Sequence, residues 1–407
     1  MYDAIVVGAR CAGSPTAMLL ARRGYRVLVV DRATFPSDVP RAHFIQPNGV
    51  ARLDRWGLLD RVRASGCPRV GNWSLDDGAL AGTPPPADPG GVVGGYAPRR
   101  SVLDEILVRA AAEAGAEVTE GFTVEELLTD GERVTGIRGH TARGEALTAR
   151  ARIVIGADGM RSMVARAVGA PAYSTHPAVT CAYFSYWSGV PTEGLEIAYP
   201  HGREVIAVGT NDGLTLVYVA WPLAAFPAIR ADVETAFMDA VDRVPGLAER
   251  VWAGERVEHW YGAADLPNFF RRSQGPGWAL VGDAGYHRDP ILAQGITDAF
   301  RDAELLSAAI DAGFGGRRPL ADALADYERR RFAAAKPMYE LNYTTALLRP
   351  PTDDQRRLRA ALRGNQRETN RFFGVVAGTV PVEDFYNADN LARIVSAAPA
   401  RVAVAVS

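Results

Sequence analysis

A glycine-containing turn near the N-terminus carries residue types that suit binding of a phosphate-containing nucleotide. The segment GARCAG at 8–13 follows an apolar run at 4–7 and precedes a stretch of helical composition at 12–23. A strand, a turn and a helix in that order present backbone N–H groups and the positive end of the helix dipole to a diphosphate. Asp31 ends the next apolar run, at the spacing expected of a carboxylate that accepts ribose hydroxyls.

One position of this turn departs from the usual GxGxxG fingerprint. Arg10 stands where the second glycine normally lets the backbone approach a pyrophosphate closely. An arginine keeps positive charge at the turn but adds a Cβ atom. The segment therefore predicts dinucleotide binding, and an ordinary βαβ unit with a glycine turn is the alternative.

Two further glycine turns follow apolar strands later in the chain. GADGMRS begins at Gly156, after the run 146–155, and GDAGYHRDP begins at Gly282, after the run 278–281. A helical stretch at 295–309 follows the second of these turns. Tight chain reversals would also need such glycines, so a purely structural role is the alternative.

Few side chains suited to acid–base chemistry lie near these turns. His43 lies in a proline-rich loop after the second strand, and His287 and Arg288 lie inside the third turn segment. Histidine titrates near neutral pH, so either histidine could relay a proton. A loop histidine bonded to the backbone is the alternative for His43.

An aromatic-rich region at 176–270 could form the wall of an apolar binding site. Alternation along a strand places Tyr183, Ser185 and Trp187 on one face, and Phe184 and Tyr186 on the other. Such side chains could equally pack the core of a sheet. The predicted wall residues are Tyr183, Ser185, Trp187, Tyr218, Trp221 and Tyr286, with Trp260 and Tyr261 as further candidates.

Periodicity predicts the elements that would position these residues. Helices are expected at 50–62, 101–114 and 231–241, and strands at 117–126, 133–140 and 146–155. β-branched and aromatic runs predict a separate, mainly antiparallel sheet containing 182–186, 204–208 and 214–221. Gly- and Pro-rich residues 76–98 predict a loop or the edge of that sheet, and 321–398 predict helices broken at Pro350 and Pro351.

Composition limits the classes of partner. The chain has 407 residues and a formal net charge of -2, which gives no general attraction to nucleic acid or anionic membranes. Its 3 cysteines are far apart, lack metal-ligand spacing and suit a reducing cytoplasm. No apolar run reaches membrane-spanning length, and no signal peptide is indicated. We therefore expect a cytoplasmic protein without a bound metal, a membrane span or a nucleic-acid partner.

The three glycine turns together resemble those of the FAD-dependent class A flavoprotein monooxygenases, the aromatic-hydroxylase group. The resemblance covers most of residues 1–310, and GADGMRS and GDAGYHRDP are its most specific parts. It implies an α/β fold with a Rossmann-like FAD-binding domain (GR2-type), a mainly antiparallel-sheet substrate domain and a helical C-terminal region. The expected boundaries are 1–75, 99–175 and 273–335 for the FAD-binding domain, 76–98 and 176–272 for the substrate domain, and 336–407 for the helical region.

The resemblance also implies roles for individual residues. The first turn would bind the FAD diphosphate, Asp31 the ribose, and Asp283 the ribityl side of the cofactor. The helix after Pro290 would direct its N-terminal dipole at the flavin pyrimidine ring, where reduced flavin carries negative charge. The residues implied to contact FAD are Gly8, Ala9, Arg10, Gly13, Ser14, Asp31, Arg32, Arg41, Arg100, Asp158, Gly159, Gly282, Asp283, Pro290, Gln294, Gly295 and Ile296.

The chemistry of the resembled family gives the functional prediction. NADH or NADPH would reduce the flavin after docking transiently, because no second glycine fingerprint is visible. Molecular oxygen would then form a flavin C4a-hydroperoxide that hydroxylates or epoxidises an aromatic or polyketide-like, hydrophobic small molecule. The prediction is an NAD(P)H- and O₂-dependent monooxygenase, with His43, His287 and Arg288 as candidate catalytic residues.

Three alternatives remain open. The chain also resembles geranylgeranyl-reductase-like flavoproteins, which saturate isoprenoid double bonds without oxygen. A flavin-dependent halogenase would need a WxWxIP segment and a usable lysine, but that segment is absent and Lys336 lies far toward the C-terminus. A non-catalytic binding protein that keeps the fold is supported only by Arg10. The sequence does not indicate an oligomeric state.

Overall fold

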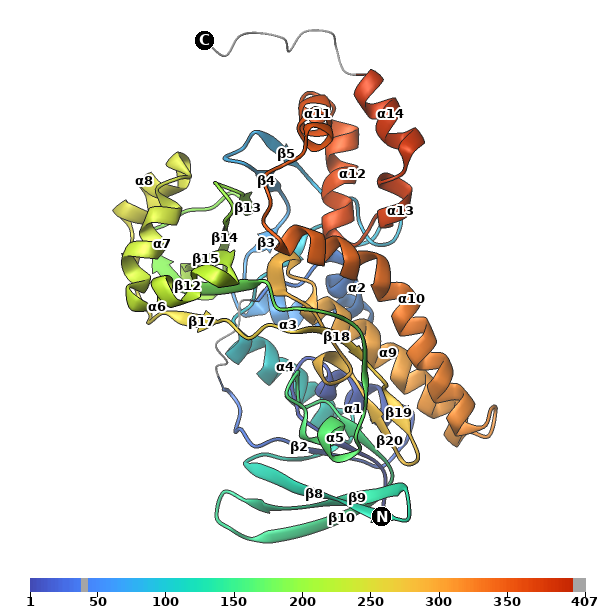
Figure 1. Ribbon diagram of the computed structural model, residues 1–407. Helices are drawn as coiled ribbons and strands as arrows, with labels where there is room; N and C mark the ends of the chain where they lie inside the picture. Colours follow the sequence, from blue (N-terminus) through green and yellow to red (C-terminus); the bar gives the residue numbers. More distant parts are fainter. Residues whose placement is uncertain (38–42, 398–407) are drawn as a thin grey trace, which may run out of the picture.

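The computed structural model describes residues 1–37 and 43–397, and a mostly parallel sheet lies in the lower part of the molecule in Figure 1. The central strands of this sheet contain buried runs of apolar, mostly β-branched residues at 4–7, 27–30 and 153–155, which suits a sheet covered on both faces. In spatial order the parallel strands are β20 (Trp278–Leu280), β10 (Ala146–Gly156), β1 (Tyr2–Val7), β2 (Val27–Val30) and β7 (Glu117–Thr119). The antiparallel β19 (Gln274–Gly275) extends the sheet beside β20. The apolar runs after which the three glycine turns were placed are therefore neighbouring strands.

Alternate residues of β1 pack on different partners. Ala4 and Val6 face a helical layer, whereas Ile5 and Val7 face an antiparallel extension of the sheet. The helical layer contains α1 (Gly13–Ala21), α4 (Arg100–Glu113) and α9 (Gly295–Phe314), which contact one another. The extension contains β8 (Phe122–Asp130) and β9 (Arg133–Thr141), and β9 pairs with the first half of β10. The small helix α5 (Met163–Ala167) lies on the same side.

The prediction of a single helix at 50–62 is wrong. The structure has α2 (Pro47–Arg55) and α3 (Leu59–Ala64), and Gly57 between them has φ +74°. A left-handed residue ends a helix because it turns the chain out of the right-handed spiral. The helices expected at 101–114 and 295–309 are present, and α9 continues five residues beyond the second range.

A second sheet forms the upper part of the molecule in Figure 1. Its strands, in spatial order, are β16 (Glu255–Arg256), β12 (Thr180–Ser188), β15 (Thr215–Pro222), β14 (Glu204–Gly209), β13 (Leu195–Ala198), β4 (Trp73–Leu75) and β5 (Leu80–Gly82), and β17 (Tyr261–Ala263) also pairs with β12. All neighbours are antiparallel except β13 and β4. The mainly antiparallel sheet predicted from the 176–270 region is confirmed, and β4 and β5 join its edge.

Both faces of this second sheet are covered. Three helices pack on its outer face, as Figure 1 shows, namely α6 (Phe226–Ala231), α7 (Val233–Val241) and α8 (Pro245–Ala253). The inner face shares a core with the C-terminal helices α11 (Asp353–Leu362) and α12 (Gln366–Ala377). A third, small sheet contains β11 (Ala172–His176), β18 (Asn268–Arg271) and β21 (Tyr286–His287).

The C-terminal region is helical, as expected from its composition. The long α10 (Leu320–Ala346) packs along α9 and ends before Pro350 and Pro351, where the sequence predicted a break. The short helices α13 (Val382–Phe385) and α14 (Ala388–Ser396) follow α12. Two-residue strands β3 (Arg69–Val70) and β6 (Gly95–Tyr96) pair beside this region. No described helix carries an apolar stretch sufficient to cross a bilayer.

Candidate functional site

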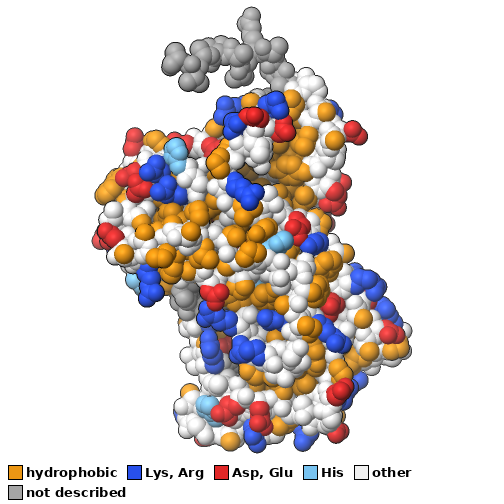
Figure 2. All heavy atoms as spheres, viewed as in Figure 1, with side chains coloured by type: hydrophobic (Ala, Val, Ile, Leu, Met, Phe, Trp, Pro, Cys, Tyr) orange, Lys and Arg blue, Asp and Glu red, His pale blue; other side chains and the backbone are white. Residues whose placement is uncertain are grey.

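One cavity of about 1210 Å³ runs from the glycine turns of the main sheet to the inner face of the second sheet. Its lining includes the turns after β1, β10 and β20, the first turn of α9, and side chains of β12, β14 and β15. Figure 2 shows hydrophobic side chains gathered over the region of the second sheet and its outer helices. The cavity therefore joins a backbone-rich end to an apolar end.

The three glycine turns meet because their strands are neighbours in a parallel sheet. Carboxyl ends of parallel strands lie at the same edge, which is where ligands bind in open α/β sheets. The turns are also bonded to adjoining strands: the Gly8 amide donates to Val30 O at 2.8 Å, and the Ala157 amide donates to Val7 O at 2.8 Å. The Val281 amide likewise donates to Gly156 O at 2.9 Å.

Close backbone approach explains why glycine is needed in these turns. A Cβ atom on Gly13 would lie 1.7 Å from Gly8 O, and one on Gly8 would lie 2.5 Å from Ala157 O. Gly8 also has φ +105°, a conformation that side chains disfavour. A Cβ atom on Gly282 would lie 2.6 Å from Ala12 Cβ. These glycines let three chain segments form one cradle whose surface is mostly backbone.

Asp31 is held rigidly at the end of β2. Its carboxylate accepts hydrogen bonds from the Ala9 amide at 2.7 Å and the Ala33 amide at 2.8 Å. The side chain is buried and lines the cavity beside Arg32. Arg41 lies outside the described residues. Asp31 therefore ties the first turn to the second strand and presents a fixed acceptor to the cavity.

The side chain of Arg10 turns toward α4. Its guanidinium donates to Asp104 at 2.7 Å and to Ser37 at 3.2 Å. Arg100 pairs with the same buried carboxylate at 3.0 Å, and the Cys11 thiol donates to it at 3.4 Å. Asp104 thus fixes two cations at the rim of the first turn, which favours an anionic ligand there. Sequence reasoning missed Asp104, although its position four residues after Arg100 was a usable signal.

Asp158 has a structural role and a vacant acceptor. Its Oδ2 accepts from the Met163 amide at 2.6 Å and the Val164 amide at 3.2 Å, so the carboxylate caps α5. Its Oδ1 is buried without a hydrogen-bond partner among the described residues. Gly159, with φ +80°, has no neighbour within 4 Å of an added Cβ. The turn therefore has both a polar atom and space for a ligand.

The first turn of α9 faces the same cavity. Gly295 and Ile296 line it, and a Cβ atom on Gly295 would meet no described atom within 4 Å. The first N–H groups of a helix have no acceptor within the helix and carry partial positive charge. The side-chain amide of Gln294 donates a hydrogen bond to Val376 O in α12, which fixes this side chain just before the helix start. Pro290 and Asp283 line the cavity near this helix start.

His43 lies in the cavity wall but is not suited to titrate near neutral pH. Its Nε2 lies 2.8 Å from the Tyr186 hydroxyl, and the ring is buried. Burial, followed by the positive charges of Arg100 and Arg99, lowers the pKa of His43 to about 3. The expected proton relay through a histidinium at this position is therefore not supported. His43 instead contributes a neutral, hydrogen-bonded ring.

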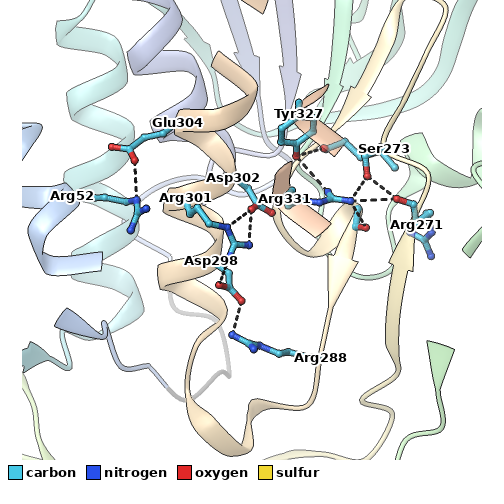
Figure 3. A network of polar contacts seen from close by, with 12 residues as sticks. Arg52, Arg271, Ser273, Arg288, Asp298, Arg301, Asp302, Glu304, Tyr327 and Arg331 are labelled. Atoms are coloured by element: carbon cyan, nitrogen blue, oxygen red, sulfur yellow. Dashed lines mark hydrogen bonds and ion pairs between the residues drawn. The ribbon is translucent and has the colours of Figure 1, made fainter. Parts of the chain in front are cut away.

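His287 and Arg288 both line the cavity, and both are anchored. His287 Nδ1 donates to Pro267 O, which leaves Nε2 as the acceptor nitrogen. Arg288 pairs with Asp298 at 2.6 Å. Figure 3 shows that Asp298 also binds Arg301, whose guanidinium continues to Asp302. Nε and Nη1 of Arg288 are buried and lack partners among the described residues.

The same figure shows a second buried cluster behind this one. Arg331 of α10 lies beside Tyr327 and donates to Ser273 and to the carbonyl oxygens of Arg271 and Gly285. It thereby ties the long C-terminal helix to the third glycine turn. Arg331 belongs to the run of arginines at 329–331, and a single sequence cannot show that one arginine of such a run points inward.

The prediction that Tyr183, Ser185 and Trp187 of β12 face the binding site is wrong. Tyr183, Ser185 and Trp187 do alternate with Phe184 and Tyr186, but the first set faces the outer helices. Trp221 lies on that side too: Trp187 stacks on Phe237 of α7, and Trp221 meets the same ring edge to face. Ser185 donates to two backbone carbonyl oxygens. Both faces are buried, so composition alone could not say which one bounds the cavity.

The cavity is instead bounded by the opposite face. Phe184 and Tyr218 line it, as does Tyr286, whose ring stacks on Phe270 at 4.4 Å. Tyr261, named as a further wall candidate, stacks on Phe184 at 5.0 Å, whereas Trp260 packs on Phe237 with the outer helices. Residues that the sequence analysis missed on this face are Ala182, Leu195, Ile197, Tyr199, Ile206, Val208 and Leu216.

The sequence and the fold match known proteins. Residues 1–341 match the family described as FAD binding domain. A 6-methylpretetramide 4-monooxygenase from Streptomyces rimosus is 28% identical over 337 residues, covering 80% of this chain and 78% of that protein. A digeranylgeranylglycerophospholipid reductase from Methanocella arvoryzae is 26% identical over 357 residues, covering 84% of this chain and 86% of that protein.

Halogenases are also similar to this chain. A tryptophan 2-halogenase from Chondromyces crocatus is 27% identical over 345 residues, or 80% of this chain, but the match spans only 64% of that protein. The solved structure of a myxobacterial chondrochloren halogenase superposes with a TM-score of 0.75 at 23% identity and covers 98% of this chain and 96% of that one. Relatives with three kinds of activity therefore share this architecture.

Proposed function

Because the chain belongs to the FAD binding domain family, we propose that it is an NAD(P)H- and O₂-dependent FAD monooxygenase that hydroxylates or epoxidises an aromatic or polyketide-like small molecule. The coarser assignment, a flavoprotein oxidoreductase, follows from the family. The single observation that carries the proposal is the continuous cavity between the glycine cradle and the apolar inner face of the second sheet. At about 1210 Å³ it exceeds the usual size of a site for one small ligand, roughly 300–1,000 Å³, so it suits a cofactor and a substrate together.

The residues at the cradle fit FAD. The backbone surface of the first turn suits a diphosphate, and the cations held by Asp104 add positive charge beside it. Asp31 suits the ribose hydroxyls, and Asp283 the ribityl chain. The vacant Oδ1 of Asp158 and the open space at Gly295 are further points where a ligand would complete the structure.

When bound, FAD supplies the redox and oxygen-activating chemistry, and the protein supplies position and electrostatics. The first N–H groups of α9 favour negative charge at the end of the cavity near Gly295 and Ile296. The aliphatic and aromatic side chains of the inner face exclude water and hold an apolar substrate. We propose that NADH or NADPH docks only transiently, because no second glycine fingerprint is visible in the sequence.

Two alternatives compete with oxygenation. Halogenation would need a lysine in the cavity, but Lys336 is the only lysine of the chain. Its Nζ donates to Ser174 at 2.8 Å and pairs with Glu340, and the residue does not line the cavity. A prenyl reductase would use the same cavity without oxygen. A non-catalytic binding protein is disfavoured by the fit of the cradle, since Arg10 points away from the turn that it interrupts.

Oxygen consumption separates these possibilities. The purified protein should be yellow, and a panel of aromatic and polyketide-like compounds should include one that stimulates NAD(P)H oxidation with matching O₂ uptake. Oxidation of NAD(P)H with reduction of an isoprenoid and no O₂ uptake would assign the reductase instead. A colourless protein that FAD does not reconstitute would contradict both.

The proposed contact between Asp283, in the third glycine turn, and the ribityl chain of FAD can be tested by Asp283→Ala. Loss of a contact to the ribityl chain should lower FAD affinity or slow flavin reduction by about tenfold, measured by flavin fluorescence and stopped-flow absorbance. Unchanged FAD content and turnover would contradict the assignment of Asp283.

A further inference from the structure

Two carboxyl groups lie toward the apolar end of the cavity, Asp289 in its lining and Glu204 on the strand beside it, and neither belongs to the expected cofactor site. Asp289 lines the cavity at the start of the segment that leads to α9. Glu204 lies on β14, two and four residues before the cavity-lining Ile206 and Val208, so its side chain is on the same face. The two carboxyl groups are close enough for the charge of Asp289 to act on Glu204.

The floor around Glu204 is made of small residues. Strand register places Glu204 opposite Ala220, which in turn lies opposite Ala182, a cavity-lining residue. In the next row Ile206 lies opposite Tyr218. A large side chain at either alanine would fill this corner. The row therefore places small side chains, one of them cavity-lining Ala182, beside the one ionisable residue of β14.

Glu204 has no cationic partner among the described residues. It is fully buried, and neither carboxyl oxygen meets a donor at full hydrogen-bond geometry. The Tyr199 hydroxyl faces it and only partly offsets burial, which raises the pKa of Glu204 well above its ordinary value. The hydroxyl of Tyr218 is also buried without a described partner. A buried polar group without a hydrogen-bond partner is energetically costly, and a bound ligand is one way to satisfy it.

Asp289 has hydrogen-bond donors around it but no cation among the described residues. Its carboxylate accepts from the Thr180 hydroxyl and from the Ile291 amide. Its neighbour Arg288 pairs with Asp298 instead, as Figure 3 shows. No described cation forms an ion pair with Asp289 or Glu204. Burial, more than any neighbour, raises the pKa of Asp289 to about 6, so the group is largely ionised at neutral pH.

We propose that Asp289 and Glu204 form a subsite that binds a protonated amino group of the substrate, an inference that rests on the substrate role proposed for this cavity. An ammonium group would bring the cation that this corner lacks and would donate hydrogen bonds to both carboxyl groups. A carboxylate-bearing substrate would be repelled. Glu204 would lose its proton to solvent when the amine binds.

Calorimetric titration of the FAD-loaded protein tests this without turnover. The probes are benzylamine, 2-naphthylmethylamine and 9-anthracenylmethylamine, each paired with its alcohol of the same ring. At least one amine should bind at least tenfold more tightly than its alcohol. Glu204→Gln and Asp289→Asn, which keep the size of the side chain and remove its negative charge, should each reduce that preference at least threefold. Glu193→Gln, on the exposed surface before β13, should leave it unchanged.

The outcomes separate this inference from the proposed function. Equal binding of amines and alcohols, no binding of either, or an amine preference that survives in both variants would overturn the subsite. Amine preference without O₂ uptake for any compound would retain the subsite and reject the monooxygenase. Flavin absorbance and melting temperature of each variant, matched to wild type, establish that the proteins compared are folded.

Discussion

The two ends of the cavity are specified in different ways. The cofactor end is built from backbone, and glycines at 8, 13 and 282 allow segments to approach at distances that a Cβ atom would forbid. The substrate end is built from side chains on one face of a sheet that is buried on both faces. A requirement for glycine can be read from a sequence, whereas the choice between two apolar faces depends on what the rest of the chain places against them.

The largest effect should come from adding one methyl group to the first turn. In Gly13→Ala the Cβ atom would lie 1.7 Å from Gly8 O, a backbone atom that cannot move without displacing β1. Overpacking against backbone should cost more than about 3 kcal/mol and strongly reduce the yield of folded protein. Chemical denaturation measures the loss. A variant with wild-type stability would show that the turn is not packed as described.

The pH dependence of stability tests Asp289, the acidic residue that lines the apolar end of the cavity. Burial raises the pKa of Asp289 from 3.8 to about 6, so the folded protein keeps this proton longer than the unfolded chain. Stability is then lost as pH rises through that window, by up to about 3 kcal/mol, and is constant above it. Asp289→Asn should remove this loss, so its stability relative to wild type should increase between pH 4 and pH 7.

Denaturation curves of both proteins at each pH, with matched flavin content, provide the measurement. The difference between them isolates Asp289 from other titrating groups. A stability difference that does not change between these pH values would mean that Asp289 is ionised as easily in the folded protein as in the unfolded chain.

Adjacent residues of β14 test which face bounds the cavity. Val205 is buried against the outer helices, whereas Ile206 lines the cavity. Val205→Ala should cost about 2 kcal/mol of stability and leave the KM for substrate unchanged. Ile206→Ala should cost less stability and raise KM severalfold. The reverse pattern in denaturation and steady-state kinetics would show that the expected face was right after all.

The substitution that should disturb the protein least, at Gly295, should change only the affinity for FAD. Gly295 begins α9 as Gly13 begins α1, but a Cβ atom on Gly295 meets no described atom within 4 Å. Gly295→Ala should leave the apo protein as stable or slightly more stable. FAD affinity should fall about tenfold, because the methyl group would occupy the space at the helix start. Equal FAD affinity in a fluorescence titration would place the flavin elsewhere.

The sequence predicted the main sheet, the second sheet and the helical C-terminal region because each has strong local patterns. The break at Gly57 was not predicted, although glycine is disfavoured inside helices and common just after their ends, so Gly57 was a usable signal. The sequence also did not show that Arg10 reaches Asp104, because these residues are 94 positions apart. Asp289 and Glu204 were missed for a related reason: an acidic residue looks solvated until the fold shows what covers it.

The central claim is that three separated turns bind one FAD whose ring faces the inner side of the second sheet. A crystal structure of the FAD-loaded protein tests it most directly. The account predicts the diphosphate at the turn of Gly8 and Gly13, and the ring between the start of α9 and Phe184. A flavin bound away from these turns, or a ring turned toward the outer helices, would contradict it.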